Sequence, residues 1–590
     1  MREEQMYILG ISCYYHDAAA CLIKDGKIIA AAQEERFTRV KHDTAFPLNA
    51  IRYCLHAAGI TMHAVEYCAF YEKPLLKFER ILSQHLEMFP QSFSTFVKAL
   101  PSWVNEKLRV PKKLRKIGYR GDVFFVEHHL AHAAAGFLAS PFKKAAILTI
   151  DGVGEWATTT YGIGNGTAIT LEKKIEFPHS IGLLYSAITA YLGFSVNNAE
   201  YKVMGLAAYG AMNKQENTYY ARLRKVIDIK DDGSFFLDMS YFTYHYADRM
   251  PSKRLCALLG GRIRKPGDAL TKRHQDIAAA VQLITEEVIM KMLTALARKS
   301  QCTAVVLSGG VALNSVANGK ILQKTPFKRV WIPPNPGDGG AAIGAAYYLY
   351  STILGQGRVA AMDSAFLGPE YTDAEIREFL DQNNIAYTQF RNTAELIAET
   401  ASLIAKNNVV AWFQGRMEWG PRALGARSIL ANPCNPRMQQ ILNAKVKHRE
   451  LFRPFAPVVC REDALTYFEC DSPLPQPTDY MLMVYVVRKT FRKKLPAITH
   501  VDGTGRLQTI ARSQHTRYYD LIKAFGKLSG ISILINTSFN IRGEPIVCTP
   551  KDAYQCMMGT GIDYLVIGSY LVQRSSNLQD AWDSEQYARD

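Results

Sequence analysis

The alternation of apolar and polar positions at the start of the chain predicts three consecutive strands. Apolar and β-branched residues fill positions 7–12, 18–23 and 27–32, and polar or glycine-containing segments separate them. An Asp-Gly pair at positions 25–26 is typical of a tight hairpin turn. Because a sharp bend through positions 14–16 follows the first apolar run, we expect strand, bend, strand, hairpin, strand.

The same order of elements recurs further along the chain. Apolar runs occupy positions 145–150, 157–163 and 168–174, and Asp151 lies among small residues at the first bend. This repeat, at a spacing of about 140 residues, is too long for a solenoid. The pattern therefore predicts two related half-domains that face each other across a cleft.

The middle of the chain predicts helices and then a domain boundary. Apolar residues fall at helical spacing in 275–299, and a second helical pattern covers 341–354. The small-residue and glycine-rich stretch 355–368 has the composition of a linker. We expect one domain from 1 to 358 and a second α/β domain from 359 to 590. Its predicted elements are helices at 373–382 and 393–406 and strands at 409–413 and 531–536.

The composition is that of an ordinary folded protein. Among 590 residues, 48% are hydrophobic and 21% are charged, and 70 Lys and Arg against 54 Asp and Glu give a net charge of +16. This surplus favours anionic ligands such as phosphates and nucleotides, and it also permits nucleic-acid binding. No aromatic-rich RNA platform is found, so we expect no nucleic-acid partner.

The cysteines and the termini indicate a cytoplasmic setting. The 11 cysteines are odd in number and have no CxxC pair, which argues against a disulfide framework and a Cys₄ zinc site. No signal-peptide pattern begins the chain, and no uncharged apolar run of about 18 residues predicts a membrane span. We therefore expect a cytoplasmic protein with no membrane partner.

A histidine pair is the sharpest local signal for a metal. If the run 127–132 is helical, His128 and His132 share one helix face and suit one metal ion. Asp151 and Asp338 lie in turns and could complete the ligand set, which would suit Fe²⁺, Mn²⁺ or Zn²⁺. The alternative is a helix with partly exposed histidines and two aspartates that act only as turn or cap residues.

Two further segments carry features of anion binding. Gly309 and Gly310 lie between an apolar strand and a helix, where backbone can approach a flat ligand or a phosphate, but they form neither a GxGxxG nor a Walker motif. In the second domain, cationic residues cluster among Gly, Pro and Trp; guanidinium groups grip phosphate, and such a cluster is less typical of a solvated basic face. The residues concerned are Arg416, Arg422, Arg427, Lys447, Arg449, Arg453 and Arg512, with Asn536 and Ser538 after a later strand.

Long sequence blocks resemble the NodU/CmcH/TobZ family of O-carbamoyltransferases. The blocks include YILGISCYYHDAAACLI, EHHLAHAAAGF, LTIDGVGEWATTT, LSGGVALN, GRMEWGPRALGARSIL, KHRELFRPFAP and INTSFNIRGEPIV. The resemblance implies an N-terminal domain of the actin/sugar-kinase type with duplicated halves and a C-terminal YrdC-like α/β domain. It implies that the C-terminal domain condenses carbamoyl phosphate with ATP and Mg²⁺ to a carbamoyl-adenylate. The N-terminal metal site then transfers the carbamoyl group to a hydroxyl of a small metabolite.

The resemblance also implies roles for individual residues. His128, His132, Asp151 and Asp338 match the metal ligands, with Fe²⁺ as the first choice, and His16 matches a residue near the transferred group that could act as general base. Lys447 and Arg449 match catalytic positions of the YrdC-like pocket. Gly309, Gly310 and Asn314 match the adenosine-binding segment, and Arg416, Arg422, Arg427, Arg453, Arg512, Asn536 and Ser538 match residues that line the second pocket.

Three rival interpretations remain open at this point. A hydrogenase-maturation carbamoyltransferase of the HypF type would carry an acylphosphatase module and paired CxxC zinc fingers ahead of the shared domains. A role in tRNA modification would need RNA binding, and a non-catalytic nucleotide-dependent switch would leave the arginine cluster unexplained. The acceptor is not fixed by the sequence; we expect its selectivity in 71–108 and 213–274, which lie outside the matched blocks. A homodimer is an option for assembly.

Overall fold

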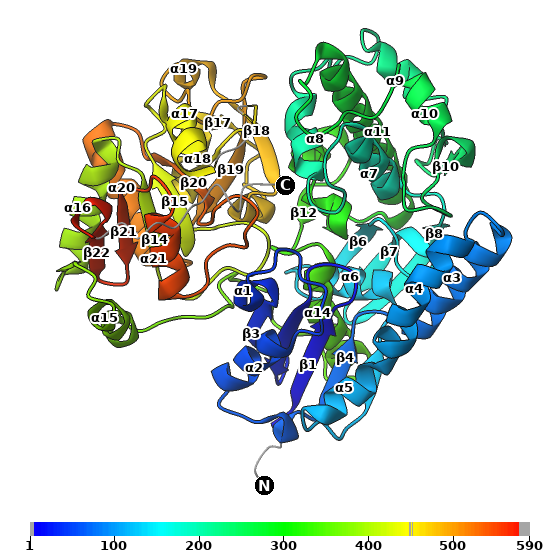
Figure 1. Cartoon of the computed structure of the whole chain (residues 1–590), viewed down its shortest axis with the longest axis horizontal. Helices are drawn as coiled ribbons and strands as arrows, with labels where there is room; N and C mark the ends of the chain where they lie inside the picture. Colours follow the sequence, from blue (N-terminus) through cyan, green and yellow to red (C-terminus); the bar gives the residue numbers. More distant parts are fainter. Residues whose placement is uncertain (1–4, 448–449, 451, 578–590) are drawn as a thin grey trace. The chain divides into compact units, whose positions relative to one another are not determined.

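The computed structural model of the protein describes residues 5–447, 450 and 452–577. The chain forms two compact units (Figure 1). The first contains Met1–Ala31 and Thr44–Met362, and the second contains Ala32–Asp43 and Asp363–Asp590. Helices and strands alternate in both, so the α/β fold class is confirmed.

The first half of unit 1 is built on a five-stranded sheet in the order β3-β2-β1-β4-β5. Its strand β1 runs antiparallel to β2 and parallel to β4, and β4 runs parallel to β5. The apolar runs at the start of the chain form the first three strands as predicted. The strands are β1 (Tyr7–Ser12), β2 (Ala19–Lys24), β3 (Lys27–Gln33), β4 (Tyr67–Phe70) and β5 (Val123–Phe125).

The second half repeats this topology in the sheet β12-β11-β6-β7-β8. Here β6 runs antiparallel to β7 and parallel to β11, and β11 runs parallel to β12. The strands are β6 (Lys144–Ile150), β7 (Ala157–Asn165), β8 (Ala168–Glu176), β11 (Ala304–Ser308) and β12 (Arg329–Trp331). The matching strand orders confirm two duplicated half-domains.

Two small-residue helices pack tightly at the centre of unit 1. Helix α14 (Asp338–Tyr348) lies against α6 (His128–Phe137) and β1. A Cβ atom on Gly344 would come 1.9 Å from the carbonyl oxygen of Ala131, so only glycine permits this approach. The helix that was predicted at 341–354 begins earlier than expected, at Asp338. Its last turn, Leu349–Ile353, is a π-helix.

Longer helices surround these sheets. Helix α11 (Lys272–Ser300) matches the helix predicted at 275–299. An insertion between β4 and β5 contains α3 (Pro74–Glu87), α4 (Phe93–Asn105) and α5 (Val110–Lys116). Across the described residues, no helix combines the length and the apolar character that crossing a lipid bilayer requires.

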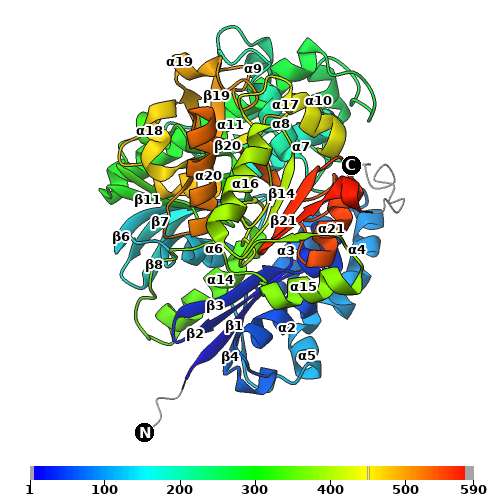
Figure 2. The same cartoon turned by 90° about the vertical axis from the view of Figure 1, so that its left-hand side faces the viewer.

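Unit 2 is built on a ten-stranded mixed sheet in the order β13-β22-β21-β14-β15-β20-β16-β19-β18-β17. Helices α16 (Thr393–Ala405) and α20 (Thr516–Ser529) lie side by side over this sheet (Figure 2), and Tyr518 and Phe525 pack with Trp412 in its core. The strands are β13 (Thr388–Gln389), β14 (Val410–Phe413), β15 (Arg427–Ala431), β16 (Ala456–Cys460), β17 (Phe468–Glu469), β18 (Met483–Val487), β19 (Thr504–Ile510), β20 (Ile533–Ser538), β21 (Tyr564–Ile567) and β22 (Tyr570–Gln573). The predicted helix at 373–382 is α15 (Asp373–Gln382), and α21 (Pro550–Met558) follows β20.

A short N-terminal segment also belongs to unit 2. After β3 the chain enters α1 (Glu35–Thr38), and residues 32–43 form part of the second compact unit. Arg36 Nη2 donates to the carbonyl of Gly420 at 2.9 Å, and Arg39 donates to the carbonyls of Pro545 and Ile546 at 2.9 and 2.7 Å. Residues far apart in the sequence therefore hold the loops of this unit together.

The first turn of α20 predicts a pH-dependent stability. Nδ1 of His515 accepts a hydrogen bond from Tyr518 N at 3.3 Å, which requires a neutral ring. Burial lowers the pKa of His515 from 6.5 to about 4. Because the unfolded chain then binds the proton first, the stability that His515 contributes is lost as the pH falls from 6.5 towards about 4. Urea unfolding across this range should show a shallower pH slope for His515→Asn, which keeps a capping acceptor.

The matched control for this prediction is His63→Asn, because His63 is an exposed histidine of unit 1. Its pH slope should equal that of the wild type. If His515→Asn and the wild type lose stability in parallel as the pH falls, His515 does not bind its proton late in the folded state, and the assignment is wrong.

Candidate metal and active site

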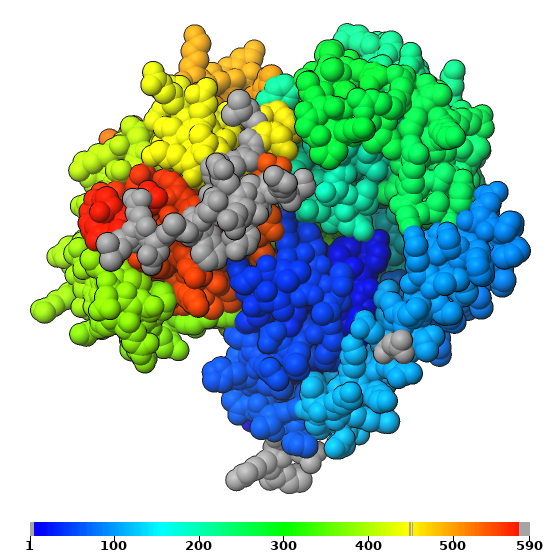
Figure 3. Space-filling view, viewed as in Figure 1, coloured from blue at the N-terminus to red at the C-terminus, as the bar shows by residue number. Residues whose placement is uncertain are grey.

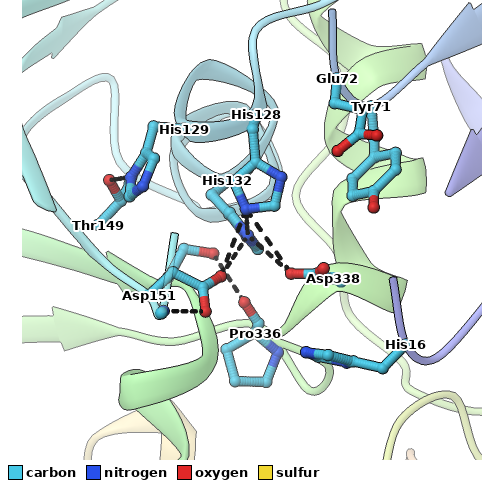
Figure 4. Close-up of polar contacts among 12 residues, drawn as sticks. His16, Tyr71, Glu72, His128, His129, His132, Thr149, Asp151, Pro336 and Asp338 are labelled. Carbon is cyan, nitrogen blue, oxygen red and sulfur yellow. Dashed lines mark hydrogen bonds and ion pairs between the residues drawn. The ribbon is translucent and has the colours of Figure 1, made fainter. Parts of the chain in front are cut away.

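Four buried side chains converge in unit 1 (Figure 4). His128 and His132 project from one face of α6, Asp151 directly follows β6, and Asp338 begins α14. One ligand atom from each lies within 4.8 Å of the others, and all four residues are buried. The structure thus brings together the residues that the sequence predicted as metal ligands.

The polar atoms of this His/Asp group face one another. His132 Nε2 lies 2.9 Å from Asp151 Oδ2 and 3.4 Å from Asp338 Oδ1, and His128 Nε2 lies 3.4 and 3.7 Å from the same two oxygens. The two Nε2 atoms are 3.1 Å apart. Neither oxygen of Asp338 receives a hydrogen bond from a described residue. Such convergence of lone pairs, buried from water, is costly unless a cation lies between them, so the donor set fits a divalent metal ion.

The backbone around the group is shaped by a carboxylate and by glycines. Glu155, which is buried, accepts hydrogen bonds from His128 N at 2.9 and 3.1 Å and from Lys73 N at 2.8 Å. It therefore satisfies the first turn of α6, where a negative charge is favoured. A Cβ on Gly154 would lie 2.9 Å from His128 Cδ2, so glycine lets this loop reach the imidazole.

His129 belongs to the same run but not to the group. Its Nδ1 pairs with Thr149 Oγ1 at 2.6 Å, away from Asp151 and Asp338 (Figure 4). Burial, with the neighbouring imidazoles, lowers the pKa of His129 well below its usual value. The neutral ring is therefore a structural hydrogen-bonding partner of β6.

The two aspartates dominate the electrostatics of the site. Burial alone would lower the pKa of His132, but its close contacts with Asp151 and Asp338 and the charges of both carboxylates raise it to about 9. Burial likewise opposes ionisation of Asp151, but hydrogen bonds from His128 and His132 hold its pKa well below the usual value. The two carboxylates therefore stabilise positive charge at the centre of the group, which is the property that a cation site requires.

His16 lies beside the group, in the bend between β1 and β2 (Figure 4). Its Nδ1 pairs with Asp17 Oδ2 at 3.0 Å. Burial lowers its pKa, but Asp338, Asp17 and Asp151 together raise it to about 10. A metal ion on the carboxylates would offset part of their charge and bring the pKa of His16 down.

The predicted adenosine segment lies next to Asp151. Gly309 has a φ of +90°, and its N donates to the carbonyl of Pro336 at 2.8 Å. A Cβ on Gly310 would come 3.0 Å from Asp151 Oδ1. The amide of Asn314 forms a reciprocal pair with Gln282 at 3.0 Å and caps Ala317 N. The glycines thus place the end of β11 against the His/Asp group, whereas the Asn314 side chain is held within the fold.

The predicted cations of unit 2 differ in their surroundings. Arg427 is fully buried: it stacks on Phe413, with its guanidinium carbon 3.6 Å from the ring centre, and Nη1 and Nη2 donate only to carbonyls, among them that of Pro369 at 3.0 Å. Arg416 is half-buried, and its Nη2 donates to the carbonyl of Leu367 at 2.7 Å. Arg427 therefore positions its loop instead of presenting a free fork to a ligand.

Lys447 holds the loop after β20. Its Nζ donates to the carbonyl of Ser538 at 2.5 Å and to the carbonyl and side-chain oxygens of Asn540 at 3.0 and 2.8 Å. Ser538 Oγ lies 3.3 Å from the same Nζ. Asn536 is buried, and its amide donates to Gln508 Oε1 and to the carbonyl of Ala423. Lys447, Asn536 and Ser538 thus belong to connected loops.

The remaining predicted residues of unit 2 are spread more widely. Arg422 is half-buried in the loop before β15, and Arg453 lies 3.8 Å from Glu450. Arg512 is exposed and pairs with Asp520 at 3.2 Å, so the structure places it at the surface. Arg449 lies outside the described residues.

Sequence reasoning missed one buried acid that organises this region. Oε1 of Glu418 accepts four backbone hydrogen bonds, from the N atoms of residues 424–427, at 2.8 to 3.1 Å. The side chain is 4% exposed. Glu418 lies between arginines in the segment GRMEWGPRALGARS. A single acidic residue among these cations is the sequence feature that could have indicated its structural role. Glu155 was missed because nothing in the sequence relates it to the start of α6.

Comparison with known proteins identifies the family of this chain. Residues 7–347 match the family described as carbamoyltransferase N-terminus, and 401–574 match carbamoyltransferase C-terminus. The chain is 45% identical to an uncharacterised protein of Synechocystis sp., over 98% of each chain. It is 35% identical to nodulation protein NolNO of Sinorhizobium fredii, over 96% of this chain and 80% of that one. HypF of T. kodakarensis, a solved structure, aligns with 60% of this chain and 48% of its own at 14% identity and a TM-score of 0.29.

The matched regions define a carbamoyl-group-transferring enzyme of two α/β units. The chain belongs to the carbamoyltransferase family, and the resemblance to its NodU-like members is confirmed. A member of this family acts on a carbamoyl donor and an acceptor.

Proposed function

We propose that the protein is an ATP-dependent O-carbamoyltransferase with a small hydroxylated metabolite as acceptor. The observation that carries the proposal is the buried group of His128, His132, Asp151 and Asp338 in a chain of this family. The first step belongs to unit 2 and the second to unit 1. The donor is carbamoyl phosphate, and Mg²⁺ accompanies ATP.

In the first step, carbamoyl phosphate loses its phosphate to water, and the resulting carbamate oxygen attacks the α-phosphorus of ATP. The products are carbamoyl-adenylate, pyrophosphate and inorganic phosphate. The two substrates together bring about five or six negative charges, whose mutual repulsion near a protein surface is about 4 kcal/mol per pair at 4 Å. Arg416, Arg422, Arg453 and Arg449 are the residues we assign to offset this charge, with Lys447 and Arg427 shaping the loops that hold them.

In the second step, the acceptor hydroxyl attacks the carbamoyl carbon and AMP leaves with the former carbamate oxygen. A bound divalent cation, with Fe²⁺ as our first choice and Mn²⁺ or Zn²⁺ as alternatives, supplies Lewis-acid chemistry at the His/Asp group. His16 is the residue that we assign to accept the hydroxyl proton, with Asp17 holding its Nδ1. Gly309 and Gly310, which pack closely against Ile150 and Asp151, are the residues that we assign to bring backbone close to the adenylate.

The direct test supplies the protein with carbamoyl phosphate, ATP and Mg²⁺ and follows pyrophosphate and inorganic phosphate. We expect both to be released in equal amounts and only when both substrates are present. A panel of hydroxylated metabolites is then screened by mass for the addition of one carbamoyl group, with AMP as co-product. If pyrophosphate never forms under any metal or acceptor condition, the protein does not use this donor chemistry.

A further inference from the structure

Helix α3 has its polarity inverted relative to an ordinary surface helix. Its buried face carries Lys77, Arg80 and His85, each 5 to 8% exposed, whereas Leu75 and Leu86 on its outer face are 73% and 67% exposed. Figure 3 shows the outer surface of this part of the chain in blue. Ordinary helices bury their apolar face, whereas the buried basic side chains of α3 lie against the aromatic rings of Tyr15, Phe96 and Phe177.

Arg80 is buried in this environment without an anionic partner. Its side chain is 5% exposed, and its Nε is buried without a hydrogen-bond partner among the described residues. Its guanidinium lies over the ring of Phe177, 4.9 Å from the ring centre. Burial lowers its pKa to about 10, although Tyr15, Glu72 and Glu155 oppose the shift. A buried guanidinium is normally paired, so the partly uncompensated charge of Arg80 is unusual for a buried position.

The neighbours of Arg80 lead to the His/Asp group. One turn earlier on α3, Lys77 pairs with Glu72, and its Nζ lies 5.1 Å from the ring centre of Tyr15. The ring of Tyr15 lies 4.7 Å from that of His16, which borders Asp338. Burial raises the pKa of Tyr15, as do the charges of Asp338 and Asp151, whereas Arg80 lowers it, so both charge groups act on one hydroxyl.

Arg80 differs from Lys77 in what it can still bind. Lys77 is already neutralised by Glu72, whereas the guanidinium of Arg80 offers planar donors that match an oxyanion. The apolar ring of Phe177, contributed by the other half-domain after β8, excludes water from one face of that guanidinium. A ligand anion at Arg80 would therefore bind across the two halves of unit 1.

We propose that Arg80 is an anion subsite beside the His/Asp group and that the acceptor carries a carboxylate, sulfate or phosphate group that binds there. This inference rests on the proposed function, because it names the class of acceptor. Arg80 holds the anionic group of the acceptor while the hydroxyl to be modified lies near His16. Lys77 and Tyr15 form the wall between the two positions.

The test measures binding of inorganic sulfate to the full-length protein by thermal unfolding, with sodium chloride at equal ionic strength as reference. We expect sulfate to stabilise the wild type and its affinity to fall by at least about tenfold in Arg80→Gln. Arg80→Lys, which keeps the charge, should retain intermediate affinity. Arg52→Gln, at an exposed arginine of unit 1, should match the wild type. Equal sulfate affinity in Arg80→Gln and the wild type would overturn the proposal.

Two further readouts separate the subsite from other roles. Without sulfate, Arg80→Gln should melt at the same temperature as the wild type or higher, because an unpaired buried charge is removed; a lower melting temperature would identify a structural arginine and contradict the proposal. AMP affinity should be unchanged in Arg80→Gln, and a tenfold loss would assign the site to the nucleotide phosphate instead. These results do not depend on catalysis, so they stand even if the wild type releases no pyrophosphate.

Discussion

Replacing His132 by alanine is expected to reduce carbamoyl transfer to an acceptor by more than about 100-fold while pyrophosphate release stays within about twofold of the wild type. His132 Nε2 lies within 3.4 Å of both carboxylates of the His/Asp group, so its loss removes a donor from the centre of the candidate metal site. The adenylate-forming step belongs to unit 2 in our proposal and should continue. The measurement is a paired assay of pyrophosphate and carbamoylated product, with metal content determined on the same preparation.

The matched control is His129→Gln, three positions earlier on α6. His129 is equally buried but faces Thr149, and glutamine can keep that hydrogen bond. It should retain metal and transfer activity. Loss of both steps in His132→Ala, with normal folding, would show that the two reactions are not divided between the units as we propose.

The second large effect is expected for Glu418→Ala. Four backbone N–H groups of residues 424–427 donate to one oxygen of Glu418 in a buried loop. Alanine would leave these donors without a partner, which should destabilise unit 2 by roughly 3–5 kcal/mol. Pyrophosphate release should fall as well, because Arg422 lies on this loop and Arg427 begins the strand that follows it. Urea unfolding followed through Trp412 and Trp419, both buried in unit 2, reports the change.

Glu370→Ala is the control for this substitution, because Glu370 is exposed in the same unit. Its effect should stay within about 0.5 kcal/mol. A Glu418→Ala protein that unfolds at the wild-type urea concentration would mean that water replaces the carboxylate without cost, and the organising role of Glu418 would be rejected.

Much of the fold could be predicted because the signals are local. The strand β1 and the capped helix α15 were predicted with the bounds that the structure has. The spacing of apolar residues and the helix cap both depend on residues that are close together in the sequence. The duplicated halves followed from the repeated order of strands and bends. The pairing of His128 with His132 followed from helical spacing alone.

Features that depend on distant contacts could not be predicted in this way. Nothing near residues 32–43 indicates that they complete the second unit, because their partners lie at Gly420 and Pro545–Ile546. The apolar residues of α3 would predict the opposite buried face from the one observed. Some arginines in unit 2 are held by backbone carbonyls, and others are not. Carbonyls such as those of Leu367 and Pro369 come from distant parts of the chain, so the residues next to each arginine do not predict which case applies.

Because the segment 32–43 belongs to unit 2, neither unit can be produced as one continuous fragment of the chain. Since the polypeptide passes between the units after Ala31, after Asp43 and after Met362, three covalent crossings join them. A fragment that starts at Asp363 would lack the guanidinium groups of Arg36 and Arg39, and the carbonyls that they bind would lose their donors. Neither unit is therefore one continuous segment of the chain, and a single splice could not exchange either of them whole.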